Sequence, residues 1–281
     1  MINRRNKDFR SCRGSLLKVL LPALILVACT EQIDWELEYL EEEVLVVEGK
    51  LTSEPGPHRV TLSKPVYEMN AIPEPVSGAR VDFFDGRSLY PLQEDPLQPG
   101  TYLTEPGFAG EPGNGYQLRI RQGGRRITAV SFMEPVTPFQ FMRTVKVQED
   151  PPLYRVYISD SGRPAIVRLI LDWSHLPGYD TLPDHLNHAV IYHYTLNSID
   201  VNEIFAPEQE QVLFPPGTVV YREKESVGPR YEEFLRGMLS ETDWRGGIFD
   251  VLPGNARTNL DEGAIGYFTA TEVIRDTLIV E

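Results

Sequence analysis

Four of the five histidines in this chain lie between residues 175 and 193. Imidazole nitrogens and carboxylate oxygens are ligand types that hold Zn²⁺, and a loop leading into a strand can bring three of them together. A zinc-bound water at such a site would support hydrolysis. The spacing matches no zinc signature, so surface or hydrogen-bonded histidines remain the alternative. The candidate ligands are His185, His188 and His193, and the aspartates interleaved with the histidines are Asp172, Asp180 and Asp184.

Three aromatic residues in or near predicted loops are candidates for contact with a ligand or partner. Trp173 ends a predicted strand, Tyr179 lies in a loop, and Trp244 precedes a Gly-Gly pair. Aromatic rings in loops stack on sugars or peptides and anchor protein interfaces. The alternative is that these rings cap the end of a hydrophobic core.

No other stretch of the chain carries a specific catalytic motif. Carboxylate pairs for glycoside cleavage need a defined separation in a cleft, and with 41 acidic residues in the chain chance pairs are expected. The glycine-rich stretch 107–115 precedes a predicted strand rather than a helix, which is not the arrangement that cradles phosphate. We therefore expect a protein without catalytic activity and without a resident cofactor.

The segment Leu26-Val27-Ala28-Cys29 lies at the end of an apolar run from Val19 to Val27, which itself follows a basic N-terminus. This pattern is typical of a bacterial lipoprotein signal peptide, which is cleaved before a cysteine that then carries fatty acids such as palmitate. The apolar run is about half of the roughly 20 residues that span a bilayer. We predict a signal peptide at 1–28, lipidation at Cys29, and a body held to the lipid bilayer through its acyl chains.

Cleavage there changes the charge and the cysteine content of the chain. The only other cysteine, Cys12, leaves with the signal peptide, so no thiol remains for a disulfide, a metal or a nucleophile. The remaining residues include 21 Lys/Arg and 40 Asp/Glu, a net charge of about −19. Such a charge argues against nucleic-acid binding and against a second, polybasic membrane contact.

The elements that must position these residues are mainly β-strands. Residues 29–43 are acidic and predict an extended tether. Short alternating runs separated by Pro and Gly predict about seven strands in residues 44–137, an immunoglobulin-like β-sandwich. Residues 138–281 predict a second β-rich domain with one short helix from about Pro229 to Leu239. The clearest strands are Val44–Leu51, Arg59–Leu62, Ala79–Phe84, Gly115–Arg121, Arg126–Phe132, Gln140–Val147, Tyr154–Ser159, Ala165–Trp173, His188–Leu196, Thr218–Tyr221, Ala264–Val273 and Thr277–Val280.

Several short pieces occur in a fixed order through most of the mature chain: Leu45–Gly49, Val60–Ser63, Pro75–Val81, Pro99–Tyr102, Gly113–Ile120, Gly246–Asp250, Asn259 and Gly266–Phe268. Through these pieces the mature chain resembles the domain of unknown function 4249 family of Bacteroidota outer-membrane lipoproteins. That family has no established activity, so no catalytic residue is implied, and the glycines and tyrosines of the matching pieces suit turns and strand faces. The resemblance implies a location in the outer membrane, with the cell surface favoured over the periplasmic face, and a role beside a TonB-dependent transporter.

Together these features favour a non-catalytic, lipid-anchored accessory that captures a ligand or docks onto a transporter. Confinement of both partners to one membrane raises their effective concentration, so a weak interface suffices. Two alternatives belong to other classes. One is an envelope zinc hydrolase using the 175–193 histidine and aspartate window, and the other is a structural adhesin or assembly factor.

Overall fold

The computed structural model describes residues 44–68, 70–139, 142–158, 162–196, 212–241 and 256–281. The chain divides into two compact units, Met1–Glu41 and Glu42–Glu281, and the described residues all belong to the second. The predicted signal peptide, Cys29 and the tether 29–43 lie outside the described residues. Within the described ranges, no helix combines the length and the apolar character that a membrane crossing requires.

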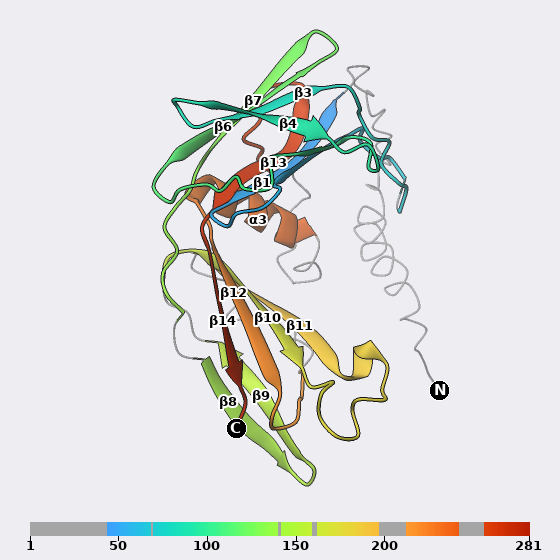
Figure 1. Ribbon diagram of the computed structural model, residues 1–281, viewed down its shortest axis with the longest axis vertical. Helices are drawn as coiled ribbons and strands as arrows, with labels where there is room; N and C mark the ends of the chain where they lie inside the picture. The colour runs from blue at the N-terminus through green and yellow to red at the C-terminus, as the bar shows by residue number, and fades with distance from the viewer. Residues whose placement is uncertain (1–43, 69, 140–141, 159–161, 197–211, 242–255) are drawn as a thin grey trace, which may run out of the picture. The chain divides into compact units, whose positions relative to one another are not determined.

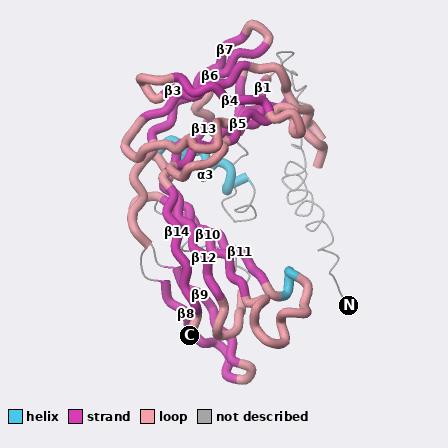
Figure 2. Tube along the Cα trace, viewed as in Figure 1, coloured by secondary structure: helices cyan, strands magenta, loops and turns pink. Residues whose placement is uncertain are grey.

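The predicted mainly β fold is confirmed (Figure 2). The first sheet has eight strands in the order β13-β1-β2-β5-β4-β3-β6-β7. Neighbouring strands in it are antiparallel, except for the parallel pair β1 and β13. Seven of its strands come from residues 44–137, as predicted. The strands are β1 Leu45–Thr52, β2 Arg59–Ser63, β3 Arg80–Phe84, β4 Leu89–Glu94, β5 Thr101–Leu103, β6 Gly115–Gln122, β7 Arg125–Phe132 and β13 Ala264–Thr271.

This sheet folds over on itself because alternate residues of its strands are apolar and share one core. In β1, Val47 and Leu51 are fully buried, whereas Glu48 and Lys50 between them are exposed. The rings of Phe83 and Phe268 stack in that core at 5.3 Å. The outer strands β7 and β13 lie side by side, and the Asn259 amide donates to carbonyls of both. The result is a sandwich-like, nearly closed arrangement.

The second sheet is antiparallel, with the order β11-β10-β12-β14. A two-stranded hairpin, β8–β9, packs on its core through Tyr154 and Val156. Burial alternates along β10, where Leu169 and Leu171 point into the core. The strands are β8 Met142–Glu149, β9 Pro152–Ile158, β10 Ala165–Asp172, β11 His188–Thr195, β12 Val219–Ser226 and β14 Val273–Ile279, and a short 3-10 helix η1 covers Asp184–Leu186.

The last two strands join the two sheets (Figure 1). β13 belongs to the first sheet and β14 to the second, with only Glu272 between them. Hydrogen bonds fix this crossing: Thr271 Oγ1 donates to the Ser226 carbonyl, and the Glu272 amide donates to Ser226 Oγ. The division into domains at 137/138 stays a prediction. The structure adds that the later segment supplies one strand to the earlier sheet.

The one α-helix among the described residues, α3, runs from Pro229 to Glu241, close to its predicted bounds. Proline suits the first turn of a helix because its missing N–H would have no intrahelical acceptor there. The rings of Tyr231 and Phe234 lie against Tyr267 of β13 at 5.0 and 4.7 Å. This aromatic cluster attaches the helix to the first sheet.

Candidate functional site

The structure does not bring the three candidate metal ligands together. His188 and His193 are five positions apart on β11, which places them on opposite faces and roughly 17 Å apart along the strand. His185 is exposed on η1. Among the described residues, no group of three or more His, Cys, Asp or Glu side chains could hold a metal ion. The fold therefore does not bring the candidate ligands of the 175–193 window together, because strand periodicity places His188 and His193 on opposite faces of β11.

His188 instead takes part in a local hydrogen-bonded cluster. Its Nε2 lies 3.2 Å from Asp172 Oδ1, and its Nδ1 lies 2.6 Å from Asn187 Oδ1. Asp172 also accepts hydrogen bonds from the amide and hydroxyl of Ser174. Burial raises the pKa of Asp172, but the Ser174 hydrogen bonds and the charge of His188 outweigh it, so the pKa lies below its ordinary value. These contacts fix the loop that follows β10.

The candidate aromatic contacts have different locations. Trp173 is 6% exposed in the second core, and its indole N–H donates to the Leu186 carbonyl at 3.1 Å. Tyr179 is half-buried against the same core. Trp244 lies outside the described residues. Trp173 is therefore a core residue rather than an exposed contact, because the loop 173–187 folds back over its ring.

Among the described residues, the large apolar side chains with the highest exposed fractions lie in two loops of the first sheet. The connection between β2 and β3, residues 64–79, exposes 79% of Tyr67 and 93% of Ile72. The turn between β4 and β5, residues 95–100, exposes 88% of Leu97. We call these two segments the paired loops. Exposed apolar side chains that protrude together mark interaction sites more often than isolated ones do.

Two side chains tie the paired loops to each other. The Glu94 carboxylate accepts one hydrogen bond from the Gly78 amide at 2.9 Å and another from the Gly100 amide at 3.0 Å. The Tyr102 hydroxyl accepts from the Ala79 amide and donates to the Val76 carbonyl. The Glu94 carboxylate thus joins the two loops, and the Tyr102 hydroxyl joins the longer loop to β5. The bases of both loops are therefore fixed, while their tips face solvent.

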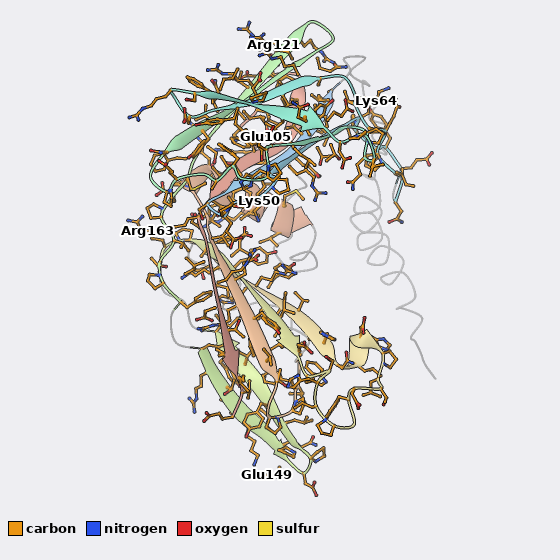
Figure 3. All side chains as sticks on the ribbon, in the orientation of Figure 1. Lys50, Lys64, Glu105, Arg121, Glu149 and Arg163 are labelled. Carbon is orange, nitrogen blue, oxygen red and sulfur yellow. The ribbon has the colours of Figure 1, made fainter. Side chains whose placement is uncertain are left out.

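The stem of the longer loop, which begins at Lys64 (labelled in Figure 3), extends the β-ladder beyond β2. The Lys64 amide donates to the Glu74 carbonyl, and Ser63 bridges Pro75. The Lys64 ammonium and the Glu74 carboxylate also form an ion pair at 2.8 Å, exposed on both sides. An ion pair of this kind contributes little to stability. The backbone ladder is therefore the main support of the stem.

The paired loops share one end of the first sheet with the start of β1. We call this the entry end. The register pairs Val46 of β1 with Ser63 of β2, and Glu94 of β4 with Tyr102 of β5. The β6–β7 turn, residues 123–124, lies at the same end.

Comparison with known proteins gives one family. Residues 30–213 match the family described as domain of unknown function (DUF4249). The chain belongs to this family. No curated protein matches it. The matched range ends before β12, α3, β13 and β14, so in this DUF4249 protein the strands that complete both sheets lie beyond the match.

Several sequence pieces that carry the family resemblance build the base of the paired loops. Gly100 has φ of 75°, and a Cβ there would lie 2.7 Å from the Leu62 carbonyl oxygen and 2.9 Å from Pro75. Only glycine fits this conformation and this space. The pieces Val60–Ser63, Pro75–Val81 and Pro99–Tyr102 thus have a structural explanation in this protein: they hold the loops.

The paired loops were not among the sites predicted from the sequence. A usable signal was present, since 16 residues separate β2 from β3 and connections longer than about 12–15 residues are uncommon in compact domains. Tyr67 and Ile72 also lie between prolines, without the alternation of a strand. What the sequence could not indicate is the contact between this loop and the β4–β5 turn.

Proposed function

We propose that this DUF4249 protein is a lipid-anchored, non-catalytic accessory of an outer-membrane TonB-dependent transporter, and that it docks through the paired loops. The observation that carries the docking step is the exposure of Tyr67, Ile72 and Leu97 on loops whose bases are fixed. Rigid aromatic and aliphatic side chains lose little conformational entropy on binding and often anchor interfaces.

The entry end supports this assignment. The described chain begins at residue 44, and β1 begins at Leu45 beside the paired loops. An acyl chain on Cys29 would precede β1 by a segment whose fully extended length is at most about 50 Å. The paired loops would then stay within reach of proteins in the same membrane, and co-anchoring would raise the effective concentration of the partner.

The shape of the surface favours docking over enclosure of a small ligand. Small-molecule sites are concave and bury most of the ligand, whereas these three side chains protrude. A protruding apolar surface needs a complementary depression on a partner protein. We therefore propose protein docking as the primary role, with the channel performing the transport.

Photo-crosslinking in cells tests the docking step. A photoreactive amino acid placed at Tyr67 or Ile72 should give a crosslink to a TonB-dependent transporter. The matched control is Tyr157 on β9, also exposed and aromatic but in the second sheet, which should give none. Absence of a transporter adduct from both loop positions under every nutrient condition would refute the proposal.

Replacement of the predicted acylation site tests the anchor separately. Cys29→Ser should move the protein from the membrane fraction to the soluble fraction and remove the crosslink, because co-confinement is lost. Incorporation of labelled palmitate into the parent, and not into Cys29→Ser, is the direct readout. If the variant stays in the membrane fraction, lipidation at Cys29 is not the anchor.

A further inference from the structure

Arginines form a row across three strands on the outer face of the first sheet. Arg80 of β3 is directly opposite Arg121 of β6, and Arg121 is directly opposite Arg126 of β7. All three are exposed, while their neighbours Val81, Ile120 and Ile127 point into the core. Like charges directly opposite on a sheet are destabilising. In a chain whose net charge is −14, such a concentration of positive charge needs an explanation.

Within the described residues, two of the three arginines in this row have no acidic partner. Arg80 pairs with Asp82 at 3.1 Å. For Arg121 and Arg126, the described part of the chain contains no side-chain hydrogen bond or ion pair. Two acids on neighbouring segments are engaged by other donors: Glu94 accepts from two loop amides, and Asp261 accepts from the amide and hydroxyl of Thr128.

A pocket of about 260 Å³ lies at the end of this row, at the entry end. Its walls include Arg121, Arg125 and Arg126, together with the two-residue turn Gly123-Gly124 (Figure 3, where Arg121 is labelled). Both glycines have positive φ, 57° and 81°, as a tight hairpin turn of this type requires. No backbone acceptor among the described residues engages their amide N–H groups. The pocket is thus lined by three guanidinium groups and by two glycines of the turn, and the guanidinium groups are hydrogen-bond donors only.

We propose that this pocket binds a phosphate-bearing anion. A guanidinium group offers paired donors that match two phosphate oxygens, and a phosphate group carries enough negative charge and enough acceptors for several arginines at once. The bound anion would also relieve the repulsion between Arg121 and Arg126. The pocket adjoins the longer of the paired loops, since Gly78 also lines it, but the proposed anion does not depend on the partner of those loops.

Thermal unfolding of the purified lipidated protein tests the site, with inorganic phosphate as the probe and chloride at equal ionic strength as the reference. Phosphate should raise the melting temperature of the parent by about 3–6 °C at concentrations near ten times the dissociation constant. The variant Arg121→Gln with Arg126→Gln should show no such rise. Without phosphate, this variant should melt at or above the parent temperature, because opposed like charges have been removed.

The matched control is Arg59→Gln with Arg87→Gln, which removes the same charge from exposed positions at the other end of the sheet. It should keep the full phosphate response. An equal phosphate response in the Arg121/Arg126 variant, or no response in the parent, would overturn the proposal. A loss in the control as well would indicate general charge screening, which also overturns it.

A second measurement separates the two sources of phosphate. The lipidated protein is placed in phosphatidylcholine vesicles with or without phosphatidic acid. A rise in melting temperature with phosphatidic acid, absent in the Arg121/Arg126 variant, assigns the pocket to a lipid headgroup. A rise with soluble phosphate alone assigns it to a free phosphate compound, and no rise in either measurement refutes the site.

Discussion

Glu94 shows how one side chain can join two loops. Its carboxylate accepts from the Gly78 and Gly100 amides, and neither amide has another acceptor among the backbone hydrogen bonds of the described residues. These hydrogen bonds, with that from Gly100 foremost, hold the pKa of Glu94 below its ordinary value. A carboxylate with a lowered folded-state pKa stabilises the protein above its unfolded-state pKa, and this contribution is lost as the pH falls through the folded-state value.

We therefore predict that Glu94→Gln lowers the free energy of unfolding at pH 7 by about 1 kcal/mol, because an amide can accept at only one of its two terminal atoms. The difference from the parent should shrink as the pH falls below about 4, where the parent also loses its carboxylate. Urea denaturation at pH 7 and pH 3 measures both values. Glu105→Gln, at an exposed position labelled in Figure 3, is the control and should have no effect. A pH-independent loss at Glu94 would contradict this account.

At the scale of elements, the β2–β3 connection combines a fixed base with an exposed tip. Its stem pairs like a strand, and its base contacts the β4–β5 turn, yet its apolar tip contributes nothing to either core. Strand periodicity allowed the strands on both sides to be predicted. The packing of one loop against another depends on side chains such as Glu94 and Tyr102, whose partners are distant in sequence, so it could not be predicted.

This separation predicts opposite consequences for tip and base. Tyr67→Ser with Ile72→Ser should change the free energy of unfolding by less than about 0.5 kcal/mol for each residue, because both side chains are exposed. The same variant should abolish crosslinking to the transporter from a photoreactive amino acid placed at Leu97, the exposed residue of the other loop. Gly100→Ala should lower the melting temperature, because its Cβ would meet the Leu62 carbonyl. Thermal unfolding and crosslinking measured on the same variants compare the two. Destabilisation by the tip variant would show that the tip is structural.

At the scale of the whole molecule, the C-terminal strands complete both sheets. β13 adds Phe268 and Ala270 to the first core, and β14 continues into Val280 in the second. The parallel pairing of β1 with β13 joins segments more than 200 residues apart. Alternation identified most strands individually, though not β4 or β5. A strand has two edges, however, and its partner is decided by tertiary packing.

A chain that ends at residue 213, where the family match ends, should therefore not fold. It would lack β12, β13 and β14, and β1 and β10 would each lose a neighbour. We expect no cooperative unfolding transition by circular dichroism or calorimetry. A cooperative transition in this truncated chain would contradict the topology.

The point variant Phe268→Ala tests the contribution of β13 to the first core in the full chain. It should lower the unfolding free energy by about 3–5 kcal/mol, with exposed Ile265→Ala as its control.

The sequence by itself determined the mainly β class, the approximate strand and helix bounds, and the family, because these follow from local periodicity, turn residues and short motifs. It also provided the net charge, from which a basic contact surface was not expected. Only the tertiary structure decided where charges and apolar residues gather. It separated the histidines of one window and buried Trp173. It also placed Arg80 of β3 opposite Arg121 of β6, because the register of these two strands is set by contacts between segments distant in the chain, whereas the Gly123-Gly124 turn places Arg121 opposite Arg126.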